Sequence, residues 1–393
     1  MSIRWIIFKE KPEVCTAMKK LYFLSVFAFL SACILPYDKA FKAQRTVLII
    51  DALLTDNPSL NKITLSRTEP SPAIDVYSFK ETGAEIFLLI DTEEHIILTE
   101  NKPGEYYFPQ GFVAKEGLSY FLNITTADGS YFESDPQRLT PTSPIESVTQ
   151  VYKTEDEADF IGARDGHSIY LNSSDEPDQK NFYRWDWKLY EKATWCKTCN
   201  ESIYYHDDTT PPEGECRASR GQFRNLVFDY SCDGECWRII PSQNTNIMSD
   251  EFVDGRPIQN RHIADIPIYQ YRGAILEIFQ YSIDETVYDY FKLVQGVAEN
   301  TGGLADTPPA SLQGNVRCIS NPDQPVAGMF IVAGVSKTNY WLDRSDAPTD
   351  FPAIGFLDGR FPNPEPTTPT RPPLAPCLES LGFTSTKPVG WQD

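Results

Sequence analysis

Between residues 45 and 142 the chain alternates between hydrophobic and polar positions with the period of two that is typical of β-strands. Pro-Gly, Glu-Gly and Asp-Gly pairs separate several of the alternating segments, as expected of turns. The segments lie at residues 47–54, 62–66, 84–90, 95–98, 104–108, 118–125 and 130–134. Because a series of short strands of this kind is typical of an immunoglobulin-like β-sandwich, we predict such a domain over residues 45–142.

Prolines mark the end of this region, because proline cannot continue a β-ladder. Pro136, Pro141 and Pro144 indicate a linker. The remainder, residues 143–393, is also rich in strand-forming sequence. We therefore predict a larger β-rich second domain, and the expected fold class is mainly β.

One helix interrupts the β pattern of the second domain. The sequence Ser282-Ile-Asp-Glu285 has the form of a capping box, and hydrophobic residues recur behind it at helical spacing as far as Glu299. Thr301-Gly-Gly then stops the pattern. We predict one main α-helix over about residues 283–299.

A row of aromatic residues alternates along residues 181–190. Tyr183, Trp185, Trp187 and Leu189 fall on one face of the predicted strand. Such a row can stack on sugar rings, so Tyr183, Trp185 and Trp187 are candidate ligand-binding residues. The alternative, which is more frequent for such rows, is the buried face of a core strand.

The N-terminal segment has the pattern of an export signal. Met18-Lys-Lys precedes an apolar run, residues 21–32, that spans about 18 Å as a helix and is therefore shorter than a bilayer core of about 30 Å. Its end, Leu30-Ser-Ala-Cys33, resembles a bacterial lipobox, in which the cysteine receives a diacylglycerol. We expect residues 1–32 to be a signal peptide with its true start at Met18, and residues 33–44 to be a tether lipidated at Cys33. An ordinary signal peptide with a chance cysteine is the alternative.

The charge balance restricts the partners. The chain carries 35 Lys+Arg against 55 Asp+Glu, a formal charge of −20. This excess argues against nucleic-acid binding, which depends on neutralising phosphates, and favours neutral or basic partners.

Nine cysteines indicate disulfides in an exported protein. Apart from Cys15 and Cys33, an odd number remains, so at least one thiol stays unpaired unless a disulfide forms between chains. We expect four of the first five to pair locally and the last two to pair with each other, holding the proline-rich segment 362–376 against the domain. A redox dithiol at the Cys-x-x-Cys pair and a zinc site remain as alternatives. The candidates are Cys196, Cys199, Cys216, Cys232, Cys236, Cys318 and Cys377.

Motifs for catalysis are missing from the sequence. The four histidines form no metalloprotease pair, and neither a Gly-x-Ser-x-Gly elbow nor a glycine-rich phosphate loop occurs. The sequence His206-Asp-Asp and the acidic run 175–178 indicate solvated turns. We predict no catalytic residues, no metal and no cofactor.

Several segments resemble, in their order along the chain, the uncharacterised outer-membrane lipoproteins of the Bacteroidota called domain of unknown function 4249. They are residues 282–291, 306–310, 314–323, 325–330 and 342–344. The resemblance extends over nearly the whole mature chain. It implies an accessory lipoprotein found beside TonB-dependent transporters, with no catalytic residues to carry over.

One departure from this family concerns the side of the membrane. Family members often carry acidic residues directly after the lipid cysteine, whereas here the first acid is Asp38. We predict an accessory binding or interaction protein of a TonB-dependent nutrient-uptake system, anchored to the outer membrane through acyl chains on Cys33, with the periplasmic or surface side left open. The alternative is a surface hydrolase acting on glycan or peptide.

Overall fold

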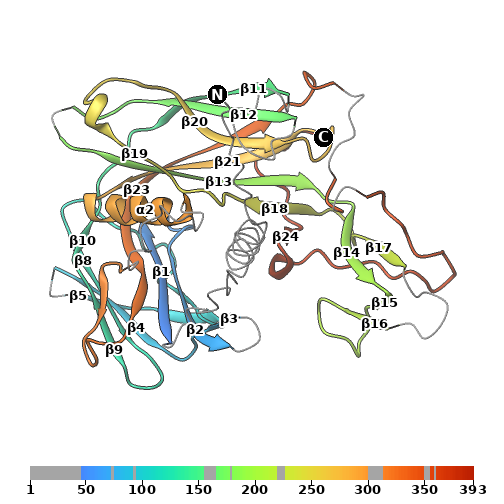
Figure 1. The fold of residues 1–393 in the computed structure, drawn as a ribbon, viewed down its shortest axis with the longest axis horizontal. Helices are drawn as coiled ribbons and strands as arrows, with labels where there is room; N and C mark the ends of the chain where they lie inside the picture. Colours follow the sequence, from blue (N-terminus) through green and yellow to red (C-terminus); the bar gives the residue numbers. More distant parts are fainter. Residues whose placement is uncertain are drawn as a thin grey trace, which may run out of the picture. The chain divides into compact units, whose positions relative to one another are not determined.

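Strands dominate the part of the chain that the computed structural model describes, which confirms the mainly β fold class (Figure 1). Contacts group residues 45–393 into one unit. The predicted signal peptide, Met18, Cys33 and the tether 33–44 lie outside the described residues. The described residues are 46–71, 75–91, 94–154, 165–177, 179–218, 226–299, 313–348, 355–357 and 360–393.

The largest sheet has 11 strands, of which β19 and β3 attach to the side of β13 and β2. In spatial order the others run from β24 to β6, with almost all neighbours antiparallel. The strands are β24 (Phe383–Thr384), β18 (Trp237–Pro241), β13 (Phe182–Lys192), β21 (Ala274–Ile283), β23 (Val326–Leu342), β1 (Val47–Thr55), β2 (Lys62–Ser71), β7 (Glu105–Tyr107), β6 (Thr99–Lys102), β19 (Asn246–Ser249) and β3 (Asp75–Lys80).

Four smaller sheets accompany the largest one. The six-stranded sheet consists of β22 (Val316–Cys318), β9 (Tyr131–Ser134), β8 (Ser119–Thr125), β4 (Glu85–Ile90), β5 (Glu94–Ile97) and β10 (Gln137–Arg138). The three-stranded sheet consists of β11 (Ile145–Lys153), β12 (Gly166–Ser173) and β20 (Ile258–Pro267). The two ribbons are β14 (Trp195–Asn200) with β17 (Val227–Ser231), and β15 (Ser202–Tyr205) with β16 (Glu215–Ala218).

The predicted sandwich is present, and later parts of the chain complete it. All seven predicted strands occur, as β1, β2, β4, β5, β7, β8 and β9, and their buried residues form one core between the two larger sheets. Strand β22 adds an edge to the six-stranded sheet, and Phe330 and Val332 of β23 enter the core. Strand β10 lies within the predicted linker, because Gln137 and Arg138 pair with β8 directly after Pro136.

Strand β23 joins the two halves of the largest sheet. Residues 326–333 run parallel to β1, whereas residues 334–342 run antiparallel to β21. At the change of partner the Gly334 N–H donates to the Thr140 carbonyl oxygen at 3.0 Å. A Cβ atom at this position would lie 2.5 Å from that oxygen, so the close approach requires glycine. The sheet is therefore continuous across the boundary predicted after residue 142.

Both faces of β21 are covered, and all ten of its residues are buried. Leu276 and Ile278 pack in a core with residues of β12 and β20 from the three-stranded sheet. Phe279 and Tyr281 point to the opposite face, where their core includes Val287 of the helix α2 (Glu285–Glu299). This two-sided burial places the aromatic row of the neighbouring strand β13 beneath the three-stranded sheet.

Helix α2 confirms the predicted helix of about residues 283–299, but its N-terminus differs from the predicted capping box. Asp284 Oδ1 accepts the hydrogen bond from the Val287 N–H at 2.8 Å. Ser282 is instead a residue of β21, paired with Tyr183 and Gly334, so sheet pairing excludes it from the cap. The other described helices are the short 3₁₀ turns η2 (Asp250–Phe252) and η3 (Glu379–Leu381). Within the described residues, no helix has the length and apolar character needed to cross a membrane.

Candidate functional site

The aromatic row of β13 lies partly in the core and partly at a cleft. Tyr183 and Trp185 are only 1% exposed and Leu189 is fully buried, whereas Trp187 is half-buried. The Tyr183 hydroxyl donates to Asp175 Oδ1 at 2.6 Å. Trp185 Nε1 donates to Gln280 Oε1 at 3.0 Å. Tyr183 and Trp185 are thus core residues with satisfied polar atoms, and Trp187 is the more exposed of the two tryptophans that line the cleft.

Trp187 lines a cleft of about 630 Å³ between β13, β20 and the segment that leads from β18 to β19. This volume is within the roughly 300–1,000 Å³ typical of small-molecule sites. Ile240 and Pro241 extend the apolar surface beside Trp187. Residues 243–246, with the sequence Gln-Asn-Thr-Asn, add three side-chain amides and a hydroxyl to the rim. The cleft therefore combines an apolar wall with hydrogen-bonding groups.

Arg261 of β20 supplies a positive charge to the same cleft. Its guanidinium carbon lies 4.9 Å from the centroid of the Trp185 ring, a cation–π contact. Nη2 donates to Asn246 Oδ1 and, at 3.0 Å, to the Ile247 carbonyl oxygen. Burial lowers the pKa of the guanidinium, since desolvation disfavours its charged form. No sequence pattern indicated Arg261 as a candidate site residue, because the residue that it packs on, Trp185 of β13, is distant in the sequence.

A histidine and an acid lie beside Arg261. His262 Nε2 is 3.1 Å from Asp265 Oδ1, which also accepts a hydrogen bond from the Ser168 hydroxyl at 2.5 Å. Burial alone would raise the pKa of Asp265, but the hydrogen bonds from His262 and Ser168 lower it below the ordinary value. In a hydrolase triad the serine bonds to the histidine. Here Ser168 bonds to the acid, so the geometry does not provide an activated nucleophile.

Three aspartates outside the cleft come together near the start of β13. Carboxylate oxygens of Asp175, Asp250 and Asp254 all lie within 4.8 Å of one another. Among the described residues, this is the group of carboxylates with the spacing of a cation site. However, Asp175 Oδ2 accepts the Gly255 N–H at 2.8 Å, and Asp250 Oδ2 accepts the Asn181 N–H at 2.7 Å. Asp175 is 5% exposed, so the predicted solvated turn is wrong at this residue. Backbone and tyrosine donors satisfy the buried acid.

Three disulfides lie in and around the ribbons β14–β17 and β15–β16, and Cys199–Cys216 links the two ribbons. They are Cys196–Cys232, Cys199–Cys216 and Cys236–Cys377. The expected local pairing of four of the first five cysteines is confirmed. Each half of the Cys-x-x-Cys pair bonds to a different partner, so neither a dithiol nor a zinc thiolate site forms from it.

The predicted pairing of Cys318 with Cys377 is wrong. Cys318 is unpaired and buried in β22, within the core of the sandwich. Cys377 belongs to a separate core around the disulfides, where Cys236 is its partner. The two cysteines are thus held in different cores, which is why they do not meet.

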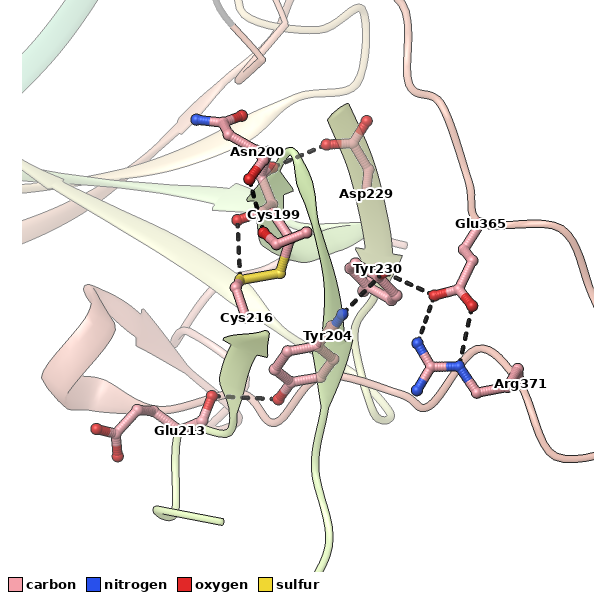
Figure 2. The surroundings of a disulfide bond; sticks show 11 residues. Cys199, Asn200, Tyr204, Glu213, Cys216, Asp229, Tyr230, Glu365 and Arg371 are labelled. Carbon is pink, nitrogen blue, oxygen red and sulfur yellow. Dashed lines mark hydrogen bonds and ion pairs between the residues drawn. A yellow bond between two sulfur atoms is a disulfide. The ribbon is translucent and has the colours of Figure 1, made fainter. Parts of the chain in front are cut away.

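The proline-rich segment lies along β17 and does not act as a free linker. Figure 2 shows Glu365 beside Tyr230 and Arg371. The Tyr230 hydroxyl donates to Glu365 Oε2 at 2.7 Å, and Arg371 donates to both carboxylate oxygens, at 2.9 and 2.6 Å. Upstream, Arg360 donates to the fully buried carboxylate of Asp229. The segment is therefore held by charge-assisted hydrogen bonds as well as by Cys377.

A comparison with family models found one match, to the domain of unknown function DUF4249, over residues 34–339. The chain belongs to the DUF4249 family. The match confirms the resemblance seen in the sequence, and it includes the cleft-lining strands β13, β18 and β20. Neither curated proteins nor solved structures gave a match.

Proposed function

We propose that this DUF4249 protein is a lipid-anchored binding protein of the outer membrane that assists TonB-dependent nutrient uptake. The observation that carries the binding role is the cleft, which is lined by the half-buried Trp187 and by Arg261. The lipobox-like sequence ending at Cys33 supports the anchor. The three disulfides support an exported location, because disulfides persist in oxidising compartments.

The geometry favours binding over hydrolysis of a glycan. Glycoside hydrolysis generally uses two carboxyl groups on opposite sides of the scissile bond. Among the described residues that line the cleft, Asp265 is the one acid, and it already accepts hydrogen bonds from His262 and Ser168. A binding role needs no second carboxylate, and it uses the apolar wall and the arginine directly.

The anchor is tested by metabolic labelling with an alkyne-bearing fatty acid in cells that express the full-length chain. We expect the wild type to carry the label and to co-fractionate with outer membranes. Cys33→Ser should lose both the label and the association with outer membranes. Cys15→Ser is the matched control and keeps both, because Cys15 precedes the predicted start at Met18. Persistent labelling of Cys33→Ser would contradict the proposed anchor.

The role in uptake is tested by affinity purification from detergent-solubilised outer membranes after mild cross-linking. A TonB-dependent transporter is expected in the wild-type sample, and not with a tagged lipoprotein of unrelated sequence. Repeated recovery of the protein without any transporter would refute the proposed partnership. The ligand-binding role is tested separately below.

A further inference from the structure

Arg261 differs from the other arginines that are partly or fully buried. Arg67 pairs with Glu81, Arg344 with Glu191 and Arg360 with Asp229. Within the described residues, Arg261 has no ion pair, although burial penalises its charge. Buried guanidinium groups normally have acceptors for their donors. A missing anion is therefore the feature that distinguishes this cleft.

The free donors of Arg261 are fixed in place. Its hydrogen bonds to described residues run from Nη2 alone, to Asn246 and Ile247. Nε is closed to solvent and has no partner among the described residues, so the donor left for a ligand is Nη1, which makes no hydrogen bond to them. The guanidinium lies over the Trp185 ring, and this contact restricts its movement. Such a preorganised guanidinium loses little entropy on binding a carboxylate, which is its preferred planar partner.

The rest of the cleft fits a sugar ring. Trp187, Ile240 and Pro241 provide an apolar surface for the C–H face of a pyranose. The amides of Gln243 and Asn244 provide donors and acceptors suited to hydroxyl groups. A few polar groups at one end of an apolar wall are the usual composition of a small-molecule site.

We propose that the cleft binds an acidic sugar, with its carboxylate on Arg261 and its ring against Trp187. This inference rests on the proposed ligand-binding role and names the class of ligand. The net charge of −20 favours neutral or basic partners at long range. Salt screens that field beyond about 8 Å, so the groups in direct contact decide the preference within the cleft.

The test compares disaccharides of galacturonic and glucuronic acid with the neutral disaccharides of galactose and glucose, by calorimetry on the full-length protein in detergent. We expect an acidic disaccharide to bind, and Arg261→Met to weaken it by about tenfold or more, as for loss of a charged hydrogen bond. Trp187→Leu weakens acidic and neutral sugars alike. Arg184→Met and Trp341→Leu are the matched controls, because neither residue lines the cleft. Arg184 lies over Phe291, and Trp341 meets Trp391 edge to face.

A second variant keeps the proposal testable if Arg261→Met folds poorly. Asn246→Asp places a carboxylate where Asn246 Oδ1 now accepts from Arg261, and it gives up the bonds that the Asn246 amide donates to the carbonyl oxygens of His262 and Ile263. The new ion pair occupies the guanidinium, so the preference for acidic over neutral sugars should fall by about tenfold or more, and thermal unfolding checks that the variant is folded. Equal binding of acidic and neutral sugars by the wild type would overturn the proposal, as would unchanged affinity in both variants. Absence of sugar binding also overturns it, whereas the anchor and the transporter partnership are decided by their own tests.

Discussion

Arg344 and Glu191 form an ion pair that is fully withdrawn from water, with both side chains 0% exposed. The guanidinium also donates to the carbonyl oxygens of Gln270 at 2.9 Å and Arg272 at 2.8 Å. The Gln270 amide in turn donates to Glu191 at 2.6 Å. Through these contacts, Arg344, which follows β23, is joined to the end of β13 and to the turn that precedes β21. We predict that Arg344→Met strongly destabilises the fold.

The magnitude follows from what methionine leaves behind. It fills the space of the arginine stem, but Glu191 stays buried without its cation. Removing one partner of a buried ion pair costs about 3–5 kcal/mol, a large share of the roughly 5–15 kcal/mol by which domains are stable. Replacing both charges with apolar side chains is often neutral or stabilising. The double variant Glu191→Leu with Arg344→Met should therefore recover most of the loss.

Urea unfolding of the purified protein at pH 7, followed by tryptophan fluorescence, measures these free energies. Lys180→Met is the control, because Lys180 is 60% exposed in its pair with Glu285, and the loss of a solvent-exposed pair should change the stability far less than the loss of the buried one. The reasoning is refuted if Arg344→Met loses less than about 1 kcal/mol, or if the double variant is as unstable as the single one.

The pH dependence gives a second signature of the same network. Burial raises the pKa of Glu191, whereas Arg344 opposes that shift. Without Arg344, the effect of burial on the pKa of Glu191 is no longer opposed by a cation, so the folded state favours the protonated carboxyl. A carboxyl whose folded pKa is raised loses stability as pH rises above its unfolded value of about 4.3. The deficit of Arg344→Met should therefore be smaller near pH 4 than at pH 7.

Three further outcomes follow from other contacts. Replacing Cys236 and Cys377 together with alanine removes a bridge with a sequence separation of 141, which the chain-entropy model values at about 5 kcal/mol and which non-reducing urea unfolding measures. Asp229→Asn should flatten the loss of stability on acidification. Burial alone would raise the pKa of Asp229, but its hydrogen bonds, of which the one from Arg360 has the largest effect, lower the pKa below the ordinary value. The ionised Asp229 therefore stabilises the fold fully above about pH 3.9, and this contribution is lost as pH falls through the folded pKa. Asp284→Ala removes the N-cap of α2 and should cost about 1 kcal/mol in thermal unfolding, and an unchanged melting temperature would contradict the cap.

Periodicity predicted the elements of this fold well, because alternation and helical spacing are local properties of the chain. The seven sandwich strands and α2 follow from it. It did not predict that β23 exchanges β1 for β21 along its length, or that β22 adds an edge to the sandwich. Both depend on which distant strands offer unpaired backbone groups, and that choice is made by tertiary packing.

The cysteines and Asp175 show the same limit at the level of side chains. Spacing along the chain favoured pairing of Cys318 with Cys377, yet membership of separate cores decides against it. The sequence around Asp175 is that of a solvated turn, yet Tyr183 and the Gly255 N–H bring donors to it from distant positions. An acid can be buried wherever such donors converge, and nothing in its immediate sequence shows them.

The aromatic row on β13 shows how one pattern produces both core and candidate site. Alternation places Tyr183, Trp185 and Trp187 on one face, and the sequence offered burial and ligand contact as alternatives for the whole row. The structure divides the row by what covers each residue. The three-stranded sheet and Arg261 cover the first two rings, whereas Trp187 lies where the segment after β18 leaves a cleft. Both tryptophans line the cleft, but Arg261 lies over the ring of Trp185, so Trp187 is the more exposed ring and the row gains a cation beside it. The alternation of the sequence indicated the aromatic part of this candidate site, whereas the charge of Arg261 is added by the packing of β20 against β13.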